Sequence, residues 1–166
     1  MPGTTRRRIE IWLPLLILAF DQLTKAAVRA RLPIHASVTV VPGLVDLTHV
    51  QNTGAAFGFL NSAAFPFKSV LIAVIAAAAL LGVAGYAASL APHQRMARVG
   101  LALIIGGAAG NLLDRVAAGS VVDFVDVYWR TYHFWAFNVA DSAISVGVGI
   151  MILDMLCVRA HVSKAA

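Results

Sequence analysis

The sequence has 166 residues, of which 60% are hydrophobic and only 13% are charged, and its mean hydropathy is +0.81. Such a chain has too little polar surface for a soluble domain, so it is predicted to be an integral membrane protein. The 13 basic residues outnumber the 8 acidic ones, but they cluster at the ends of apolar stretches, which indicates membrane topology and no nucleic-acid partner. The single cysteine, Cys157, excludes an intrachain disulfide.

The first apolar stretch, residues 9–28, follows a run of three arginines. A cleaved signal peptide is the alternative interpretation, because it also has a basic start and a short apolar core. However, Asp21 and Lys25 stand where a small-residue cleavage site is expected, and three further apolar stretches follow. An uncleaved transmembrane helix is therefore favoured, since about 20 residues span the ~30 Å hydrocarbon core.

Residues 29–65 are predicted to be a polar extracytoplasmic segment. Alternating Val, Thr and Leu residues around the Pro-Gly pair at 42–43 predict short strands joined by a turn. In the following QNTGAAFG, residues 51–58, Asn52 and Gly54 supply an amide and a permissive backbone position among apolar neighbours. An ordinary turn at the membrane interface is the alternative interpretation of this segment.

Three more apolar stretches are predicted to be transmembrane helices: 66–91, 99–116 and 138–158. The second of these contains a GxxxG pair, Gly106 and Gly110, which allows another helix to approach closely. Residues 117–137 form a second extracytoplasmic segment, whose aromatic side chains are expected to lie at the membrane interface.

The distribution of charge predicts the orientation of these helices. Basic residues gather at the chain ends and at the middle connector: Arg6, Arg7, Arg8, Arg95, Arg98, Arg159 and Lys164. This side, with both termini, is predicted to be cytoplasmic. Six of the eight acidic residues then fall on the outer side or at its boundary: Asp21, Asp46, Asp114, Asp123, Asp126 and Asp141. Carboxylates at a bilayer boundary are costly unless they are paired, hydrated or protonated, so this outer rim is a candidate functional site.

Helical spacing groups polar side chains at this outer rim. Asn111, Asp114 and Arg115 share one face of their predicted helix, as Asn138 and Asp141 do on the last one. The first helix adds a predicted ion pair between residues 21 and 25, which either anchors the helix end or supports a site.

Closely spaced carboxylates indicate a specific chemistry. In a poorly hydrated pocket two of them cannot both ionise cheaply, so one holds a proton while the other stays charged. Such a pair can activate a water and protonate a leaving amine, as in aspartic proteases. The sequence contains no HExxH motif for zinc and no serine in a GxSG context. Spacing alone does not select Asp123 over Asp126 or Asp114 for this role.

Four sequence blocks carry a family resemblance. They are DQLTK at 21–25, QNTGAAFG at 51–58, GGAAGNLLDR with VVDF at 106–124, and FNVADS at 137–142. In this order they resemble lipoprotein signal peptidase, the type II signal peptidase family of bacteria. The blocks reach from the first predicted helix to the last, and no departure from the family pattern is found in them.

The resemblance implies roles for individual residues. The catalytic aspartates of the family fall on Asp123 and Asp141, and Asp114 falls on a structural position. Supporting or substrate-binding roles are implied for seven others: Asp21, Lys25, Asn52, Gly54, Asn111, Arg115 and Asn138.

The resemblance also implies the reaction. The family is a metal-free, cofactor-independent aspartic peptidase of the bacterial inner membrane that is inhibited by globomycin. It cleaves prolipoproteins on the amino side of a cysteine that carries a diacylglyceryl group. The implied partners are these substrates and membrane lipids, and residues 54–58 and 29–49 are expected to close over the site. The oligomeric state is left open, and a monomer is compatible with the sequence.

Two other classes of function are alternative interpretations of the sequence. A proton-coupled transporter predicts an acidic residue near the middle of the membrane, whereas here Asp141 and Asp154 are separated by about 20 Å of apolar helix. A noncatalytic scaffold needs its carboxylates only for pairing with bases, so replacement of Asp123 or Asp141 by Asn would leave its activity largely intact.

The sequence therefore predicts an all-α integral membrane protein with four transmembrane helices, a small extracytoplasmic β-rich segment and a partly helical loop. Residues 1–166 are predicted to form a single membrane domain with its active site near the outer leaflet.

Overall fold

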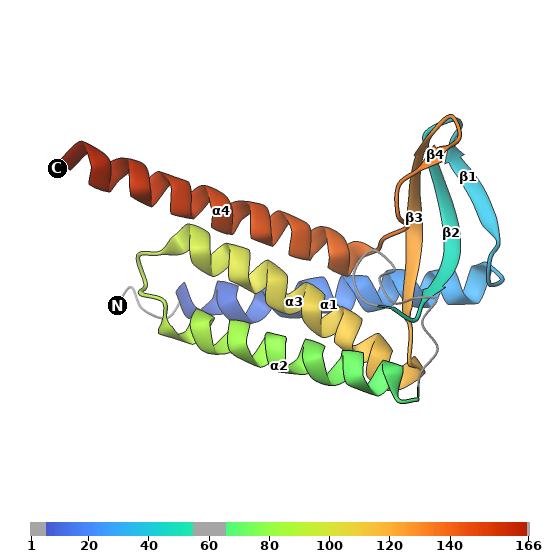
Figure 1. Cartoon of the computed structure of the whole chain (residues 1–166), viewed down its shortest axis with the longest axis horizontal. Helices are drawn as coiled ribbons and strands as arrows, with labels where there is room; N and C mark the ends of the chain where they lie inside the picture. Colours follow the sequence, from blue (N-terminus) through green and yellow to red (C-terminus); the bar gives the residue numbers. More distant parts are fainter. Residues whose placement is uncertain (1–5, 55–65, 166) are drawn as a thin grey trace.

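The structure, a computed structural model, describes residues 6–54 and 66–165. In this part of the chain four helices lie beside one another, and a small sheet covers one end of them (Figure 1). The helices are α1 (Arg6–Arg31), α2 (Lys68–Ser89), α3 (Arg95–Ala118) and α4 (Val139–Ala165). The strands are β1 (Ser37–Val41), β2 (Val45–Asn52), β3 (Val121–Trp129) and β4 (Tyr132–His133).

Each of these helices holds a stretch that is long and apolar enough to cross a membrane. Among the described residues these stretches are Ile11–Arg31, Lys68–Ser89, Arg95–Ala118 and Val139–Cys157. The chain is therefore a multi-pass membrane protein, as the sequence predicts. The helix ends differ from the expected ones by a few residues, except that α4 continues to Ala165, beyond the expected end at residue 158.

The sheet is antiparallel, with the strand order β1-β2-β3-β4. The predicted turn joins β1 to β2, and Gly43 has a φ of 79°, a left-handed conformation that glycine adopts without strain. In the register of β2 with β3, Val50 pairs with Asp123 and Asn52 pairs with Val121. Asn52 and Asp123 are therefore diagonal neighbours on one face of the sheet.

The second extracytoplasmic segment, expected at 117–137, is mostly sheet, and the partly helical loop stays a prediction. Helix α3 ends at Ala118 with Gly119 in a left-handed conformation, φ 71°, and residues 121–133 then form β3 and β4. The reason is local composition, because VVDFVDVYW is rich in β-branched and aromatic residues that fit a pleated sheet. Pairing with β2 then satisfies the backbone groups of the strand.

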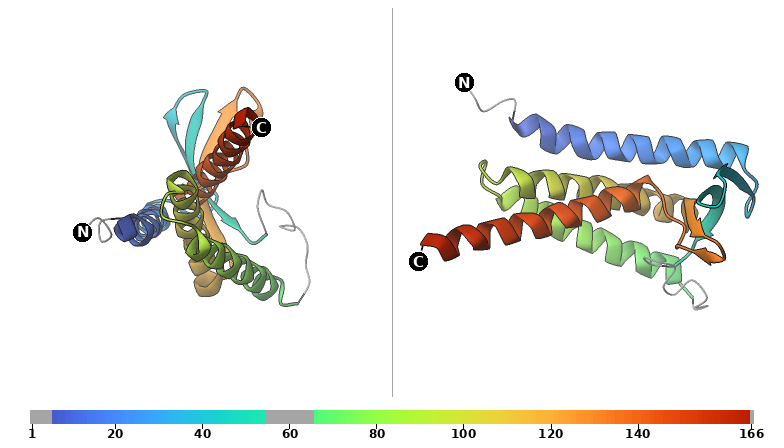
Figure 2. Two further views of the ribbon diagram at one scale, coloured as in Figure 1. Left: turned by 90° about the vertical axis from the view of Figure 1, so that its left-hand side faces the viewer. Right: turned by 90° about the horizontal axis from the view of Figure 1, so that it is seen from above.

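Helix α3 lies at the centre of the bundle, with α1, α2 and α4 arranged around it (Figure 2). Small residues let these neighbours approach. A Cβ atom on Gly106 would lie 2.9 Å from the carbonyl oxygen of Pro14, and one on Gly110 would lie 2.5 Å from Oδ2 of Asp21. Both glycines of the predicted GxxxG pair therefore face α1, which confirms that the pair permits a close helix contact.

The contact of α3 with α4 depends on Gly107. A Cβ atom there would overlap the carbonyl oxygen of Ala140, which is backbone and cannot rotate away. We expect Gly107→Val to lower the stability by about 1–3 kcal/mol through overpacking. The control is Gly85→Val on α2, where a Cβ atom meets nothing within 4 Å. Thermal unfolding in detergent micelles compares the two, and equal midpoints would contradict this account of the α3–α4 contact.

Candidate active site

A buried ammonium group joins the first and third helices. Lys25 on α1 is 0% exposed, and its Nζ lies 2.8 Å from Asp21 Oδ2 and 2.9 Å from Asp114 Oδ2. It also donates a hydrogen bond of 2.8 Å to Asn111 Oδ1. The ion pair predicted from the spacing of residues 21 and 25 is thus confirmed. All three donor positions of the ammonium are used, as a buried charge requires.

Asp21 connects this lysine to the last helix. Its second oxygen, Oδ1, accepts a hydrogen bond of 3.0 Å from the backbone N–H of Ala140 in the first turn of α4. The first N–H groups of a helix have no partner within the helix, so a carboxylate there is stabilising. Asp21 therefore fixes the start of α4 against α1.

Asp114 connects the lysine to the sheet. Its Oδ1 is paired with Arg29 at 2.8 Å, and its Oδ2 accepts a 3.4 Å hydrogen bond from the N–H of Val122. Val122 directly precedes Asp123, so Asp114 places the strand that carries that aspartate. The sequence analysis did not identify Arg29 or Gln22 as supporting residues. The side-chain amide of Gln22 donates to both Asp21 and Asp114. Arg29 follows Lys25 by one helical turn, and this spacing is the signal that could have revealed it.

Asp141 lies in the first turn of α4 and is held by two asparagines. Asn111 Nδ2 donates to its Oδ1 at 2.7 Å. The N–H of Asn138 donates to Asp141 Oδ2 at 3.2 Å, while the N–H of Asp141 donates to Asn138 Oδ1 at 3.0 Å. This reciprocal pair is a capping box, which explains why α4 begins at this point in the sequence.

Asp123 on β3 is held by two amides as well. Asn138 Nδ2 donates to its Oδ1 at 2.7 Å, and Asn52 Nδ2 donates to its Oδ2 at 3.1 Å. The N–H of Gly54 donates to Asn52 Oδ1 at 2.9 Å, which fixes the orientation of the Asn52 amide. The side chain of Asn138 therefore contacts both aspartates and joins them into one unit.

The surroundings of Asp123 favour its protonated form. The residue is only 4% exposed, and this burial raises the pKa of its carboxyl group to about 7, with the nearby charge of Asp141 acting in the same direction. Hydrogen bonds from Asn52 and Asn138 to the carboxylate act in the opposite direction but are outweighed. A carboxyl group in this state can hold or release a proton near neutral pH.

Arg115 closes one side of this group of residues. Its guanidinium donates to the carbonyl oxygen of Gly54 at 3.0 Å and to that of Asn111 at 3.2 Å. It therefore ties the end of β2 to α3. The structure describes Gly54, but the rest of the segment expected to close over the site, residues 55–58, lies outside the described residues.

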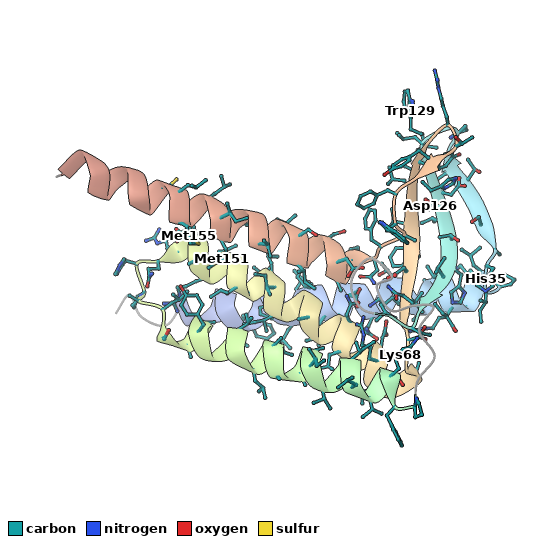
Figure 3. All side chains as sticks on the ribbon, viewed as in Figure 1. His35, Lys68, Asp126, Trp129, Met151 and Met155 are labelled. Atoms are coloured by element: carbon teal, nitrogen blue, oxygen red, sulfur yellow. The ribbon has the colours of Figure 1, made fainter. Side chains whose placement is uncertain are left out.

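Both aspartates line a single cavity of about 200 Å³. Asn52, Asn111 and Arg115 complete its polar part. The opposite wall is apolar and includes Phe134, Trp135, Phe137 and Ile144. The sequence assigned the aromatic residues of 117–137 to the membrane interface and missed that three of them line this cavity. Trp129 does not line the cavity and is exposed at the far tip of the sheet (Figure 3), so its interfacial position stays a prediction.

The structure separates Asp126 from this cavity. Asp123 and Asp126 are three residues apart on one strand, so their side chains point to opposite faces of the sheet. Asp126 is instead paired with His133 of β4, with Nδ1 and Oδ2 2.8 Å apart, and lies out on the sheet (Figure 3). Residue spacing alone also allowed Asp114 and Asp126 as catalytic candidates. Asp114 is instead ion-paired with Lys25 and Arg29, and the side chain of Asp126 points away from the cavity.

The residues singled out in the sequence thus form one connected group. Hydrogen bonds and ion pairs link all of them: Asp21, Lys25, Asn52, Gly54, Asn111, Arg115, Asp123, Asn138 and Asp141. Two carboxylates that are both bound by Asn138, one with its pKa near neutrality, can divide one proton between them beside a cavity large enough for water. That arrangement suits general acid–base hydrolysis.

Comparison with known proteins identifies the family. The family model described as "Signal peptidase (SPase) II" matches residues 13–157, which is most of the chain. The chain belongs to the signal peptidase II family. This confirms the resemblance carried by the four sequence blocks.

Curated members of the signal peptidase II family cover most of the chain. The lipoprotein signal peptidase of Geobacter metallireducens is 47% identical over 139 residues, which are 84% of this chain and 85% of that protein. The lipoprotein signal peptidase of Symbiobacterium thermophilum is 41% identical over 91% of this chain and 96% of its own length. That of Pseudomonas putida is 42% identical over 92% and 90%.

Solved structures agree with this family assignment. A bacterial membrane enzyme determined by the in meso method at 2.3 Å resolution is 32% identical, with a TM-score of 0.79 over 89% of this chain and 87% of that one. A second such structure, at 1.9 Å resolution, has a TM-score of 0.77 at 27% identity and covers 89% and 92%. The fold of this signal peptidase II is therefore that of a bacterial membrane enzyme.

The buried lysine of this signal peptidase II offers a test of its electrostatics. Lys25→Met removes the ammonium group that pairs with the buried carboxylates of Asp21 and Asp114. We therefore expect the free energy of unfolding to fall by about 3–5 kcal/mol. Adding Asp21→Asn to Lys25→Met should restore part of the loss, because it removes one uncompensated charge. Arg31→Met, at an exposed position at the end of α1, is the matched control and should leave the thermal midpoint unchanged. A midpoint for Lys25→Met equal to that of the control would show that the buried ion pairs contribute nothing.

Proposed function

We propose that this chain is an intramembrane aspartic endopeptidase that removes signal peptides from prolipoproteins, cutting on the amino side of a diacylglyceryl-modified cysteine. One observation carries the proposal. Asp123 and Asp141, from a strand and a helix, line the same cavity and are bridged by the amide of Asn138. Membership of the signal peptidase II family supports the substrate class.

In the proposed reaction the two aspartates share one proton. The ionised carboxylate takes a proton from a water in the cavity, and the resulting hydroxide attacks the carbonyl carbon of the scissile peptide bond. The protonated carboxyl group gives its proton to the carbonyl oxygen as the tetrahedral intermediate forms. When the intermediate collapses, one of its two hydroxyl groups returns a proton to the pair of aspartates (the dyad). The C–N bond breaks, and the amine leaves with the other proton that the dyad holds. The products are a free carboxyl terminus and a free amine, and the dyad again holds one proton.

The raised pKa of Asp123 supports this residue as the acid at the start of the cycle. Asp141 then acts as the base, and the donors Asn111 Nδ2 and Asn138 N–H stabilise its charged form. Asn52 holds the carboxyl group of Asp123 in place. These three asparagines are uncharged, so they orient the dyad without competing for its proton.

The charge distribution supports an orientation with both termini in the cytoplasm and the site near the outer leaflet of the bacterial inner membrane. Arg95 and Arg98 begin α3 at the end of the bundle opposite the sheet (Figure 1). The proposed site takes groups from α1, α3, α4 and the sheet, which supports a single membrane domain. A substrate helix in the bilayer would present its cleavage site at this depth, where water meets lipid.

The proposal predicts the effect of removing either carboxylate. Asp123→Asn and Asp141→Asn should each lower kcat by about 10³-fold or more, because one member of an acid–base pair is lost. Asp126→Asn is the control, since Asp126 contacts His133 outside the cavity, and should keep most of the activity. The measurement is cleavage of a diacylglyceryl-modified prolipoprotein by purified protein in detergent. If folded Asp123→Asn or Asp141→Asn works at nearly the wild-type rate, the noncatalytic scaffold becomes the better account.

The proposal also predicts a pH dependence. Asp123 must carry the shared proton at the start, and its pKa is raised to about 7. We therefore expect kcat/KM to fall as the pH rises above about 7, as the dyad becomes doubly ionised. Initial rates between pH 5 and 9, values chosen to bracket that pKa by roughly two units, test this. Asp126→Asn should keep the same profile, and activity that rises steadily up to the most alkaline pH would contradict the assignment of the proton to Asp123.

A further inference from the structure

Arg115 lies between two hollows of the molecule. On one side it lines the cavity with Asp123 and Asp141. On the other it lines a groove of about 530 Å³ on the surface of α2 and α3. The two hollows therefore border the same side chain, and the groove lies next to the proposed active site.

The lining of the groove changes from polar at one end to apolar along the rest. Its lining comes from five residues of α2, between Ser69 and Ala77, from three residues of α3, between Leu112 and Val116, and from Gly119, which follows α3. The polar groups, Arg115 and Ser69, lie at the end near the cavity. Further from the cavity the lining is apolar. Residues 69 to 77 span about 12 Å of helix, so the groove runs from the site into the hydrocarbon region of the membrane.

Helices α2 and α3 pack directly against each other, with axes about 8–10 Å apart, so the groove lies on the surface of the pair and not between them. Its floor is open because Ala73 and Ala77 have short side chains. Helix α2 packs mainly on α3, and Ile72 is its one buried residue, all of α2 being described by the structure. Among the described residues only α2, α3 and Gly119 line the groove, which is open enough to hold a flexible hydrocarbon chain.

We propose that this groove holds one acyl chain of the diacylglyceryl group of the substrate. The inference rests on the proposed function, in which the lipid is attached to the residue beside the scissile bond. A chain that starts at that residue in the cavity passes Arg115 and descends along α2 and α3. The polar end of the groove then faces the glyceryl ester, and the apolar end faces the hydrocarbon.

A second apolar hollow shows what an ordinary lipid-facing surface looks like in this protein. It lies on α1, is lined by Trp12, Leu13, Leu15, Leu16 and Ala19, and has a volume of about 610 Å³. It carries no charged residue and shares none with the cavity of the two aspartates. Bilayer lipid would occupy this hollow and the α2–α3 groove alike, whereas a substrate acyl chain would occupy only the groove.

The first experiment narrows the groove and compares two substrates. Ala77→Phe places a large ring at the apolar end, and Ala78→Phe, at the adjacent exposed position outside the lining, is the matched control. Cleavage of a prolipoprotein with long acyl chains is compared with that of the same peptide carrying a dibutanoylglyceryl group, which is too short to reach residue 77. We expect Ala77→Phe to raise KM for the long-chain substrate by roughly tenfold with kcat unchanged, because uniform binding is lost. Its kinetics with the short-chain substrate should match those of Ala78→Phe, which also shows that the variant is folded.

The second experiment locates the chain directly. A substrate with a photoactivatable diazirine on one acyl chain is bound to the Asp141→Asn variant, irradiated, and the labelled peptides are identified. We expect labelling on Ser69–Ala77 that excess unlabelled substrate removes. Equal labelling of residues 12–19, or labelling that unlabelled substrate does not remove, would identify the occupant as bilayer lipid and overturn the proposal.

The outcomes separate this inference from the proposed function. If the wild type cleaves the long-chain substrate but Ala77→Phe and Ala78→Phe have the same KM, the groove assignment is wrong and the peptidase function stands. If the wild type cleaves neither substrate, the proposed function fails and the groove assignment fails with it.

Discussion

The buried ammonium of Lys25 is the group on which the geometry of the site depends. Two of its three partners contact α4: Asp21 accepts from the backbone of its first turn, and Asn111 donates to the carboxylate of Asp141. The third, Asp114, accepts from the backbone at the start of β3. One charge on α1 thereby sets the positions of both elements that carry the proposed dyad. Such a charge is tolerated in the interior only because all its donors are satisfied, so the network is cooperative and breaking any part of it is costly.

Neutral amides make the direct hydrogen bonds to the dyad. Three asparagines, Asn52, Asn111 and Asn138, donate to its oxygens, and burial favours the protonated form of Asp123. Amide groups do not titrate, so a proton shared by the two carboxyl groups stays on them. Lys25 is hydrogen-bonded to Asn111, which in turn donates to Asp141, so a neutral amide lies between the ammonium and the dyad.

The bundle combines tight and loose packing around α3. Glycines on α3 bring α1 and α4 into backbone contact, which gives the charged network a rigid frame. Helix α2 is mostly exposed along its length, and the groove beside it borders Arg115, which also lines the cavity. In a membrane the apolar surface left by this loose packing faces lipid at little cost, so a hydrocarbon chain can enter from the bilayer without displacing water.

The sequence by itself determined the features that depend on neighbouring residues. Hydropathy and length gave the four spans, the Pro-Gly turn gave the first hairpin, and helical spacing gave the pair of Asp21 and Lys25. Only the tertiary structure decided which aspartates meet, because Asn111 and Asp141 are 30 residues apart and Asn52 and Asp123 are 71 apart. The aromatic side chains that line the cavity and the groove beside α2 were likewise absent from the local pattern. Each arises from packing between elements that are distant in the sequence, and such contacts produce no periodic pattern in the sequence itself.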